Sequence, residues 1–500
     1  MAQMLFQNLI GGKWVGGAAG GTFPTYNPAT EAKVGDVALA DAGDVEAAVQ
    51  AAQQAYPAWR STPAPRRGEI LQRVGELLRE RKDNLARLLT QEMGKVLAEA
   101  RGDVQEAIDM AFYMAGEGRR LLGYTAPVEL PDKFGMAVRE SIGVCALITP
   151  WNFPIAVPSW KIFPALIAGN TLVWKPSPES PATALAFAQV FQEAGLPAGV
   201  LNVVCGPGAE LGQALVAQPG VRVISFTGST ATGRAIAAEA GRLGKKVSLE
   251  MGGKNAILVL DDANFELAVD AITWSAFGTT GQRCTACSRL LVQRGIAARL
   301  KEALAARARK LRLGDGLDPA VDVGPVIHRA AQARIAEYVG LGLAEGARVL
   351  TGGQALSVDG RGFFFQPTLL DAVTPGMRVE RDEIFGPVLS IVEVDSLDAA
   401  VQVANGSPYG LSSSIFTQDV NQAFRAMRDL TTGIVYVNHG TTGAEIQFPF
   451  GGTRGTGNGH REAGQTGLEV FTEWKSIYVD FSGRLQRAQI DTDVILGPGA

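Results

Sequence analysis

The segment that decides the fold is Val221-Arg-Val-Ile-Ser-Phe-Thr-Gly-Ser-Thr-Ala-Thr-Gly233, where an apolar run leads through a turn into a helical stretch expected from Gly233 to Ala240. Similar apolar runs stand at residues 144–148, 171–174 and 200–204, separated by alanine-rich amphipathic stretches. Strands that alternate with amphipathic helices are typical of βαβ units. We therefore expect an α/β fold with a parallel sheet.

A second alternating series follows, with clear strands at residues 256–260, 289–292 and 433–437. Residues 44–123 carry apolar side chains at three- and four-residue spacing, which predicts covering helices. The chain has 500 residues, whereas a single hydrophobic core stops growing at roughly 250 to 300 residues. We therefore expect two α/β domains.

Composition and charge exclude several classes of protein. Lys and Arg number 46 against 50 Asp and Glu, for a net charge of -4, and the absence of a dense basic run argues against nucleic-acid binding. Residues 1–12 lack the features of a signal peptide, and no uncharged apolar stretch of about 18 residues occurs. Four cysteines are too few for a disulfide scaffold. We expect a cytoplasmic protein that does not enter a membrane.

Cys284 ends a glycine-rich segment, Phe277-Gly-Thr-Thr-Gly-Gln-Arg-Cys284, that follows a helical run over residues 265–276. A thiol on such a turn could act as a nucleophile, although an isolated cysteine is more often a small buried hydrophobe. Cys287 completes a CxxC pair, which could indicate redox or zinc chemistry. A zinc site needs about four ligands, and the three histidines make no ligand-spaced pair. We expect no metal.

Three further polar motifs follow strand-like segments. Glu250 precedes two glycines and could serve as a general base, although a surface acid is the simpler interpretation. The turn at Gly228 could bind a phosphate through backbone N–H groups, and an ordinary turn is the alternative. Asn152 could donate to an oxyanion, or could form an Asx-type turn.

Together and in this order, these segments resemble the aldehyde dehydrogenase superfamily over almost the whole chain. The matching motifs are Trp151-Asn-Phe-Pro, Trp174-Lys-Pro-Ser, Phe226-Thr-Gly-Ser, Leu249-Glu-Met-Gly-Gly-Lys, Gly281-Gln-Arg-Cys, Glu383-Ile-Phe-Gly-Pro and Pro449-Phe-Gly-Gly. The resemblance implies a Rossmann-like cofactor-binding domain, an α/β catalytic domain and a small β oligomerisation arm.

The resemblance also implies a mechanism. Cys284 would attack the aldehyde carbon as a thiolate, and the Asn152 side chain with the Cys284 N–H would hold the oxyanion. After hydride transfer to the nicotinamide, Glu250 would activate the water that hydrolyses the thioester. Lys161 joins the catalytic set. Relatives that transfer the acyl group to coenzyme A tend to lack this glutamate, so we expect release of a free acid.

The residues implied for the cofactor are Trp151, Lys175, Ser177, Gly208, Gly212, Phe226, Gly228, Ser229, Glu383 and Phe385. Lysine and carboxylate groups suit ribose hydroxyls, and the N-terminus of a helix suits the pyrophosphate. In NAD-preferring relatives a glutamate stands three residues after the lysine, where this sequence has Pro178, and Glu179 follows. We expect NAD or NADP, with NAD slightly favoured.

The substrate pocket implied by the resemblance contains Phe153, Trp160, Arg283, Thr285, Gly443, Ala444 and Phe450, with Thr441, Thr442, Glu445, Gln447 and Phe448 on the same loops. The segment Thr441-Thr-Gly-Ala-Glu-Ile resembles the loop that holds the far carboxylate in semialdehyde-oxidising relatives. We therefore expect a small semialdehyde as substrate, with Arg283 as a further candidate partner of its carboxylate.

The domain boundaries implied by the resemblance are residues 1–123 with 142–251 for the cofactor, 252–452 for catalysis, and 124–141 with 475–500 for the arm. The arm would pair with a neighbouring subunit, giving a homodimer or homotetramer. Two other classes stay open. A non-catalytic relative of the fold would have lost some of the matched positions, and a thiol-disulfide protein would need both Cys284 and Cys287.

Overall fold

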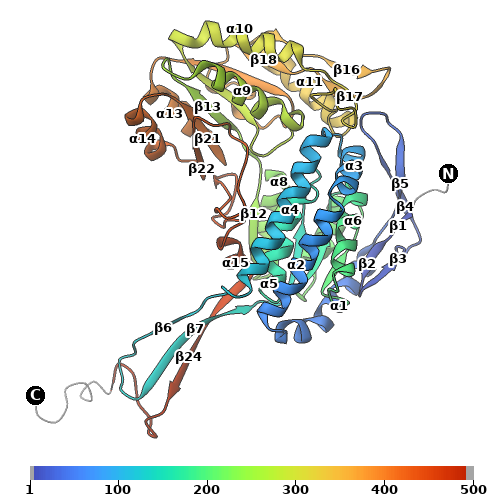
Figure 1. Cartoon of the computed structure of the whole chain (residues 1–500), viewed down its shortest axis with the longest axis vertical. Helices are drawn as coiled ribbons and strands as arrows, with labels where there is room; N and C mark the ends of the chain where they lie inside the picture. Colours follow the sequence, from blue (N-terminus) through green and yellow to red (C-terminus); the bar gives the residue numbers. More distant parts are fainter. Residues whose placement is uncertain (1–4, 491–500) are drawn as a thin grey trace, which may run out of the picture.

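The computed structural model describes residues 5–490 and contains two α/β bodies with a long β arm that projects from the first body (Figure 1). Each body is built on a seven-stranded sheet. The α/β class expected from the sequence is confirmed. The first body holds the N-terminal half of the chain and the second holds most of the rest.

The sheet of the first body has the strand order β12-β11-β8-β9-β10-β2-β3. Its strands are β2 (Asn8–Ile10), β3 (Lys13–Val15), β8 (Val144–Ile148), β9 (Thr171–Lys175), β10 (Leu201–Val203), β11 (Val221–Thr227) and β12 (Lys246–Glu250). The strands from β8 to β12 pair in parallel, and β2 pairs antiparallel with β10. Every residue of β8 and β9 is buried, as expected where both faces of a parallel sheet are covered.

The helices of this body are α1 (Ala42–Ser61), α2 (Ala64–Glu80), α3 (Lys82–Met93), α4 (Leu97–Glu117), α5 (Ala156–Ile167), α6 (Pro181–Glu193), α7 (Gly208–Ala217) and α8 (Thr230–Arg242). The long helix α4 packs against α2, α3 and α5. Helix α8 begins three residues before the expected Gly233, because the Ser229 hydroxyl accepts a hydrogen bond from the Thr232 N–H and caps the first turn.

The sheet of the second body has the order β15-β18-β19-β14-β13-β21-β22, parallel except for the edge pair β15 and β18. Its strands are β13 (Asn255–Val259), β14 (Cys287–Gln293), β15 (Arg348–Thr351), β18 (Thr368–Asp371), β19 (Val388–Val394), β21 (Ser412–Phe416) and β22 (Ile434–Val437). Its helices are α9 (Phe265–Phe277), α10 (Arg294–Lys310), α11 (Arg329–Ala344), α12 (Arg378–Arg381), α13 (Leu397–Asn405) and α14 (Val420–Asp429).

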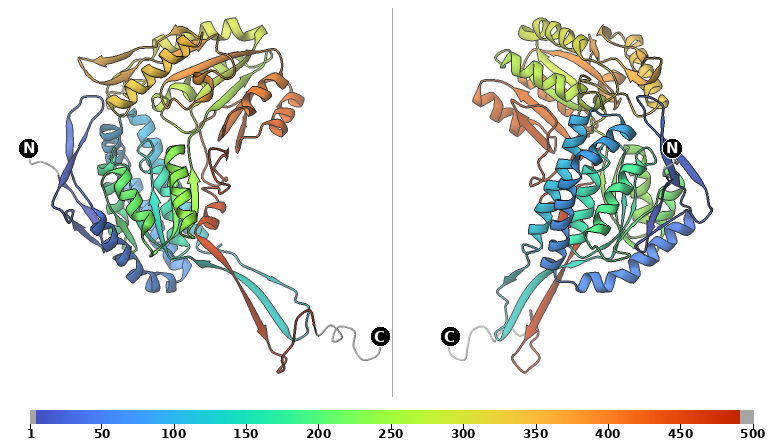
Figure 2. Two further views of the ribbon diagram at one scale, coloured as in Figure 1. Left: turned by 180° about the vertical axis from the view of Figure 1, so that it is seen from behind. Right: turned by 45° about the vertical axis from the view of Figure 1, so that its right-hand side comes forward.

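The arm is a three-stranded antiparallel sheet that stands clear of both bodies (Figure 2). It consists of β6 (Tyr124–Ala126), β7 (Lys133–Ser141) and β24 (Thr472–Asp480), so the terminal strand pairs with the hairpin. The rest of the predicted arm segment, residues 491–500, lies outside the described residues. Within residues 5–490 we find no helix that is long and apolar enough to span a membrane.

Shorter elements complete the chain. They are β1 (Leu5–Phe6), β4 (Thr22–Tyr26), β5 (Lys33–Ala38), β16 (Ala355–Val358), β17 (Arg361–Phe365), β20 (Tyr409–Gly410), β23 (Thr453–Arg454) and α15 (Thr466–Val470). The chain crosses from the first body to the second directly after β12, because Glu250 ends β12 and Asn255 begins β13. This crossing places Glu250 where the two bodies meet.

Candidate active site

Cys284 lies on the loop between α9 and β14 and is the only one of the four cysteines whose side chain is partly exposed. Its carbonyl accepts a hydrogen bond from the Asn255 side chain at 2.7 Å. Gly253 passes close beside it, since a Cβ at that position would stand 2.5 Å from the Cys284 carbonyl oxygen. The absence of a side chain at Gly253 therefore lets the link between the two bodies reach the thiol loop.

Cys287 does not share this setting. It begins β14, is buried in the apolar core of the second body, and donates from Sγ to the Arg289 carbonyl at 3.3 Å. All four cysteines carry free thiols. Of the CxxC pair, only Cys284 is open to a substrate.

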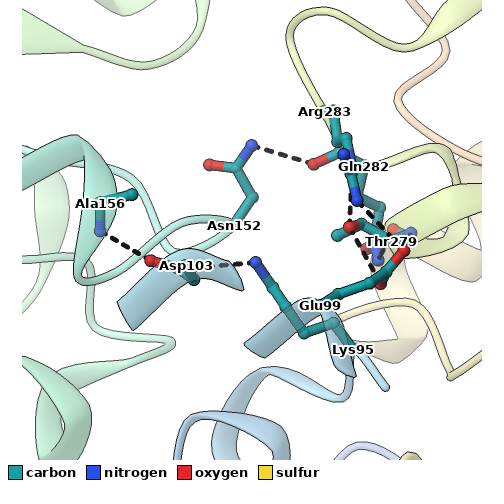
Figure 3. Close-up of polar contacts among 8 residues, drawn as sticks. All are labelled: Lys95, Glu99, Asp103, Asn152, Ala156, Thr279, Gln282 and Arg283. Atoms are coloured by element: carbon teal, nitrogen blue, oxygen red, sulfur yellow. Dashed lines mark hydrogen bonds and ion pairs between the residues drawn. The ribbon is translucent and has the colours of Figure 1, made fainter. Parts of the chain in front are cut away.

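Asn152 stands on the loop between β8 and α5 and is buried. Its amide nitrogen donates to the carbonyl oxygen of Gln282 at 2.9 Å, two residues before Cys284 (Figure 3). An amide nitrogen carries two N–H bonds, so one N–H fixes the side chain against the thiol loop. The second N–H could serve an oxyanion near Cys284.

Glu250 is buried, with 3% of its surface exposed, and neither carboxylate oxygen has a hydrogen-bond partner within residues 5–490. A Cβ on Gly451 would stand 2.5 Å from Oε1 of Glu250, so a glycine is needed beside the carboxylate. The buried, unpartnered acid differs from the solvated surface acid that was the alternative at this position. A carboxylate whose oxygens have no partner is free to accept a proton from a water molecule, as a general base does.

Glu250 shares its surroundings with a buried ion pair between Lys161 and Glu462. Lys161 also donates to the Ser225 hydroxyl at 3.0 Å. Burial, followed by the negative charge of Glu462, raises the pKa of Glu250 well above its ordinary value, and Lys161 opposes this effect. Burial, then the charges of Glu250 and Glu383, raise the pKa of the Cys284 thiol. Both groups therefore bind a proton more tightly than the same groups do in water.

The glycine-containing turn after β11 is tied directly to Glu250. The Gly228 N–H donates to the Glu250 carbonyl at 3.0 Å, and the Phe226 ring packs beneath the turn, 2.6 Å from where a Cβ on Gly228 would lie. The buried Thr227 hydroxyl has no partner among the described residues. A Cβ on Gly208 or Gly212 of α7 would meet no atom within 4 Å.

A lysine and a glutamate from opposite bodies complete the polar groups expected for a dinucleotide. Lys175 ends β9, and burial lowers its pKa to about 8. Glu383 accepts the Gly253 N–H at 2.9 Å, and a Cβ on Gly252 would lie 2.1 Å from its carboxylate. Ser177 lies two residues after Lys175, and its hydroxyl accepts the Glu179 N–H. These groups fit the hydroxyl and phosphate chemistry of a dinucleotide.

Trp151 and Phe385 meet edge to face, with ring centroids 5.7 Å apart. Trp151 comes from the first body and Phe385 from the second, so the contact joins the Asn152 loop to the Glu383 loop. Phe385 has a φ of 59°, in the left-handed region that a phenylalanine rarely adopts. The two bodies therefore contact each other at this aromatic pair.

The loop after β22 borders a cavity of about 280 Å³. Its lining includes Tyr436, Gly443, Ala444, Glu445, Phe448 and Phe450. Burial, then the charge of the nearby Cys284, raises the pKa of Tyr436 to about 12. Thr441 and Thr442, which directly precede Gly443 in the chain, are buried, and their hydroxyls have no partner within the described range.

The remaining substrate-pocket residues are already engaged. Trp160 is buried and packs on Phe450 with ring centroids 4.7 Å apart. Thr285 is buried directly after the thiol. Arg283 pairs with Glu99 at 3.1 Å and donates to the Thr279 hydroxyl at 2.8 Å. The Arg283 charge, a candidate partner for a substrate carboxylate, is therefore compensated within the protein.

The sequence analysis did not predict several residues that contact the site. Glu462 lies in an irregular glycine-rich segment, where nothing indicates that it pairs with Lys161. Asn255 is a polar residue at the start of an otherwise apolar strand. Glu99 and Asp103 could have been noticed, because they place two acids on a buried face of α4.

Cys284, Asn152 and Glu250 lie on loops where the two bodies meet, together with polar groups that fit a dinucleotide. Comparison with known proteins indicates the same kind of enzyme. Residues 14–477 match the model of the aldehyde dehydrogenase family. An α-ketoglutaric semialdehyde dehydrogenase of Bacillus subtilis (strain 168) is 40% identical, over 95% of this chain and 98% of that protein. A succinate-semialdehyde dehydrogenase [NADP(+)] of Escherichia coli (strain K12) is also 40% identical, over 94% and 96%.

Solved structures give the same result. A betaine aldehyde dehydrogenase of Staphylococcus aureus, solved in complex with NAD+, superposes with a TM-score of 0.94 at 34% identity, covering 96% of this chain and 95% of that one. An NADP-dependent enzyme of Escherichia coli superposes with a TM-score of 0.92 at 40% identity, covering 95% and 98%. The resemblance seen in the motifs is confirmed, and the chain belongs to the aldehyde dehydrogenase family.

Proposed function

We propose that this enzyme oxidises a small aldehyde bearing a carboxylate, a semialdehyde, to the free acid with NAD or NADP. The observation that carries the proposal is the pair of buried, unpartnered hydroxyls of Thr441 and Thr442, directly before Gly443, which lines the cavity shared with Tyr436. Buried polar groups normally have a hydrogen-bond partner. A ligand carboxylate would supply one, and the relatives named above as semialdehyde dehydrogenases act on substrates of this kind.

The chemistry of the cavity supports a carboxylate at its far end. Gly443 has a φ of 105° and is exposed, so its N–H and the two hydroxyls could reach one anionic group. Hydrogen bonds to a charged group contribute about 1.5–3 kcal/mol each. Arg283 would add only a weak attraction, because Glu99 balances its charge. Recognition would therefore rest on the loop from Thr441 to Gly443.

The first covalent step would take place on Cys284. The thiol passes its proton to water and the sulfur attacks the aldehyde carbon, so a C–S bond forms, the C=O π bond breaks and the carbonyl oxygen becomes an oxyanion. The free N–H of Asn152 and the backbone N–H of Cys284 would stabilise that oxyanion. When bound, a nicotinamide dinucleotide accepts the hydride that leaves the aldehyde carbon. A thioester on Cys284 remains.

The thioester would then be hydrolysed with Glu250 as general base. Its two unpartnered oxygens are available to take a proton from water. The hydroxide adds to the thioester carbon, the C–S bond breaks, and the free acid leaves with the thiol restored. Burial raises the pKa of this base most, the Glu462 charge raises it further, and the Lys161 charge opposes both effects.

The groups that would hold the cofactor come from both bodies. Lys175 and Glu383 would bind ribose hydroxyls, and the turn of Gly228 and Ser229 would receive the pyrophosphate at the N-terminus of α8. Pro178 occupies the position where a glutamate would repel a 2'-phosphate, so we favour NAD only slightly over NADP.

The arm would join copies of this chain into a dimer or tetramer. It exposes Tyr124, Phe134, Trp474 and Tyr478 to solvent. Unpaired edge strands with exposed aromatic residues are hazards for aggregation unless another chain covers them. Light scattering should give a mass of two or four chains, and a stable monomer at micromolar concentration would contradict this assignment.

A spectrophotometric screen tests the proposed function. The enzyme is mixed with semialdehydes and with unsubstituted alkanals of matched length, with NAD and NADP in parallel. We expect reduction of cofactor in a 1:1 ratio with acid formed, and a higher kcat/KM for the semialdehydes. A preference for long alkanals would contradict the substrate class, and no reduction with any aldehyde would contradict the activity.

A further inference from the structure

Two of the buried acids on helix α4 contact the active-site loops, although the proposed chemistry does not use them. Glu99 and Asp103 are 7% and 1% exposed and lie one helical turn apart, on one face of the helix. Both point toward the active-site loops, Asp103 on one side and Glu99 on the other (Figure 3). Buried acids are rare unless their oxygens accept hydrogen bonds or pair with cations.

Asp103 holds the loop that carries Asn152. Its Oδ1 accepts the N–H of Ala156 at 2.6 Å, where α5 begins four residues after Asn152. Its Oδ2 pairs with the fully buried Lys95 at 3.0 Å. The Lys95 ammonium in turn lies 3.5 Å from the centre of the Phe153 ring, next to Asn152. Asp103 and Lys95 together therefore fix the backbone and one side chain of this loop.

Glu99 holds the loop that carries Cys284. Its two oxygens accept the N–H of Thr279 at 2.8 and 3.0 Å, and Oε2 also accepts the Thr279 hydroxyl at 3.1 Å. Thr279 and Thr280 have φ angles of 50° and 57°. Such left-handed angles are genuine outliers for β-branched residues, so they need support from their surroundings. The three contacts from Glu99 provide that support five residues before the thiol.

The two loops meet where the Asn152 amide donates to the Gln282 carbonyl. Helix α4 thus joins both loops a second time, from behind. We propose that Glu99 and Asp103 are positioning residues that use the rigid spacing of one helical turn to hold Asn152 and Cys284 in register. This inference rests on the proposed roles of Asn152 and Cys284 and adds a set of supporting residues to them.

The expected effect of releasing one loop is selective. A misplacement of about 1 Å in reacting groups can cost about a hundredfold in rate. The groups expected to hold the cofactor come from the turn after β11, from Lys175 and from Glu383, none of which contacts Glu99. Loss of Glu99 should therefore lower kcat and leave the KM for the cofactor unchanged.

The test compares Glu99→Gln with Asp262→Asn as a matched control. Asp262 also accepts two backbone N–H groups and a threonine hydroxyl, at a loop of the second body far along the chain from the site. We expect Glu99→Gln to lower kcat by about tenfold or more, with the cofactor KM within twofold of the parent, and Asp262→Asn to keep both values. A kcat of Glu99→Gln within twofold of the parent would overturn the proposal.

A second change distinguishes loop positioning from general damage. Glycine adopts left-handed angles freely, so Thr279→Gly placed on Glu99→Gln should restore several-fold of the lost kcat. No recovery would overturn the proposal. If Glu99→Gln does not fold, Thr279→Val, which keeps the N–H and loses the hydroxyl, replaces it. A kcat lowered several-fold supports positioning, and an unchanged kcat overturns it.

The rate at which iodoacetamide alkylates Cys284 keeps this inference separate from the proposed function. It needs no aldehyde and no turnover. A released loop should expose the thiol, so Glu99→Gln should be alkylated several-fold faster than the parent, and Thr279→Gly should reverse part of that change. An equal rate in parent and variant would overturn the positioning role, even if the parent oxidises aldehydes well.

Discussion

The backbone N–H of Gly228 donates to the carbonyl oxygen of Glu250 at 3.0 Å, which joins the expected pyrophosphate turn to the expected base. Strands β11 and β12 pair in parallel up to Thr227 and Glu250, so this bond continues their ladder by one step. A change in the turn should therefore alter both the binding of the cofactor and the rate of hydrolysis at Glu250.

Gly228→Ala tests this link. The new Cβ would stand 2.6 Å from the Phe226 ring, too close for contact, so either the ring or the turn must shift. We expect a higher KM for the cofactor together with a lower kcat, measured by steady-state kinetics at saturating aldehyde. Gly244→Ala is a poor control because its φ is 64°, whereas Gly241→Ala has open space and should change neither constant. A Gly228→Ala enzyme with parental constants would contradict the link.

Glu462→Gln should shift the pH dependence of the reaction. Burial and then the Glu462 charge raise the pKa of Glu250, and a general base acts only when deprotonated. Removing the Glu462 charge lowers the pKa of Glu250, so the acidic limb of the kcat profile should move to lower pH. Glu239→Gln, on an exposed ion pair, serves as the control. A shift of the limb to higher pH would contradict the coupling.

Asn152→Ala should remove one donor to the oxyanion. Loss of such a donor lowers kcat by about 10² to 10³. One N–H of the amide already binds the Gln282 carbonyl, so the loss should also loosen the thiol loop. Stopped-flow measurement of the first turnover gives the rate of hydride transfer directly. A decrease of less than about tenfold would argue against the oxyanion role.

Thr441→Val and Thr442→Val test the carboxylate subsite. Each substitution keeps the volume of the side chain and removes a hydroxyl that has no partner among the described residues. We expect kcat/KM for a semialdehyde to fall by about tenfold, which corresponds to about 1.4 kcal/mol, while the value for an unsubstituted alkanal stays unchanged. Equal losses on both substrates would show that the hydroxyls serve the fold.

Much of the fold was predictable because its signals are local. The apolar runs at residues 144–148 and 221–225 correspond to strands β8 and β11. Helix α8 begins earlier than expected because the Ser229 side chain caps its first turn. Glu250 ends a strand before two glycines and Cys284 follows a glycine-rich turn, whereas Asn152 follows a strand between prolines. None of these local signals was specific alone, and the roles expected for the three residues came from the combined motifs.

The supporting contacts were not predictable, because they depend on tertiary packing. Lys161 and Glu462 pair across 301 residues of sequence, and Glu99 reaches Thr279 across 180. No periodicity encodes such a pair. Arg283 illustrates the same limit: its position beside the thiol suggested a substrate contact, and only the structure reveals Glu99 as its partner.

Mass spectrometry of Glu250→Gln after mixing with a semialdehyde and cofactor tests the covalent route through Cys284 most directly. Attack and hydride transfer should proceed while hydrolysis stops, so one acyl group per chain should accumulate on the Cys284 peptide with a single burst of reduced cofactor. Cys284→Ser should show neither signal, and Cys287→Ser should turn over like the parent. An acyl group on Cys287, or cofactor reduction by Cys284→Ser, would contradict the mechanism.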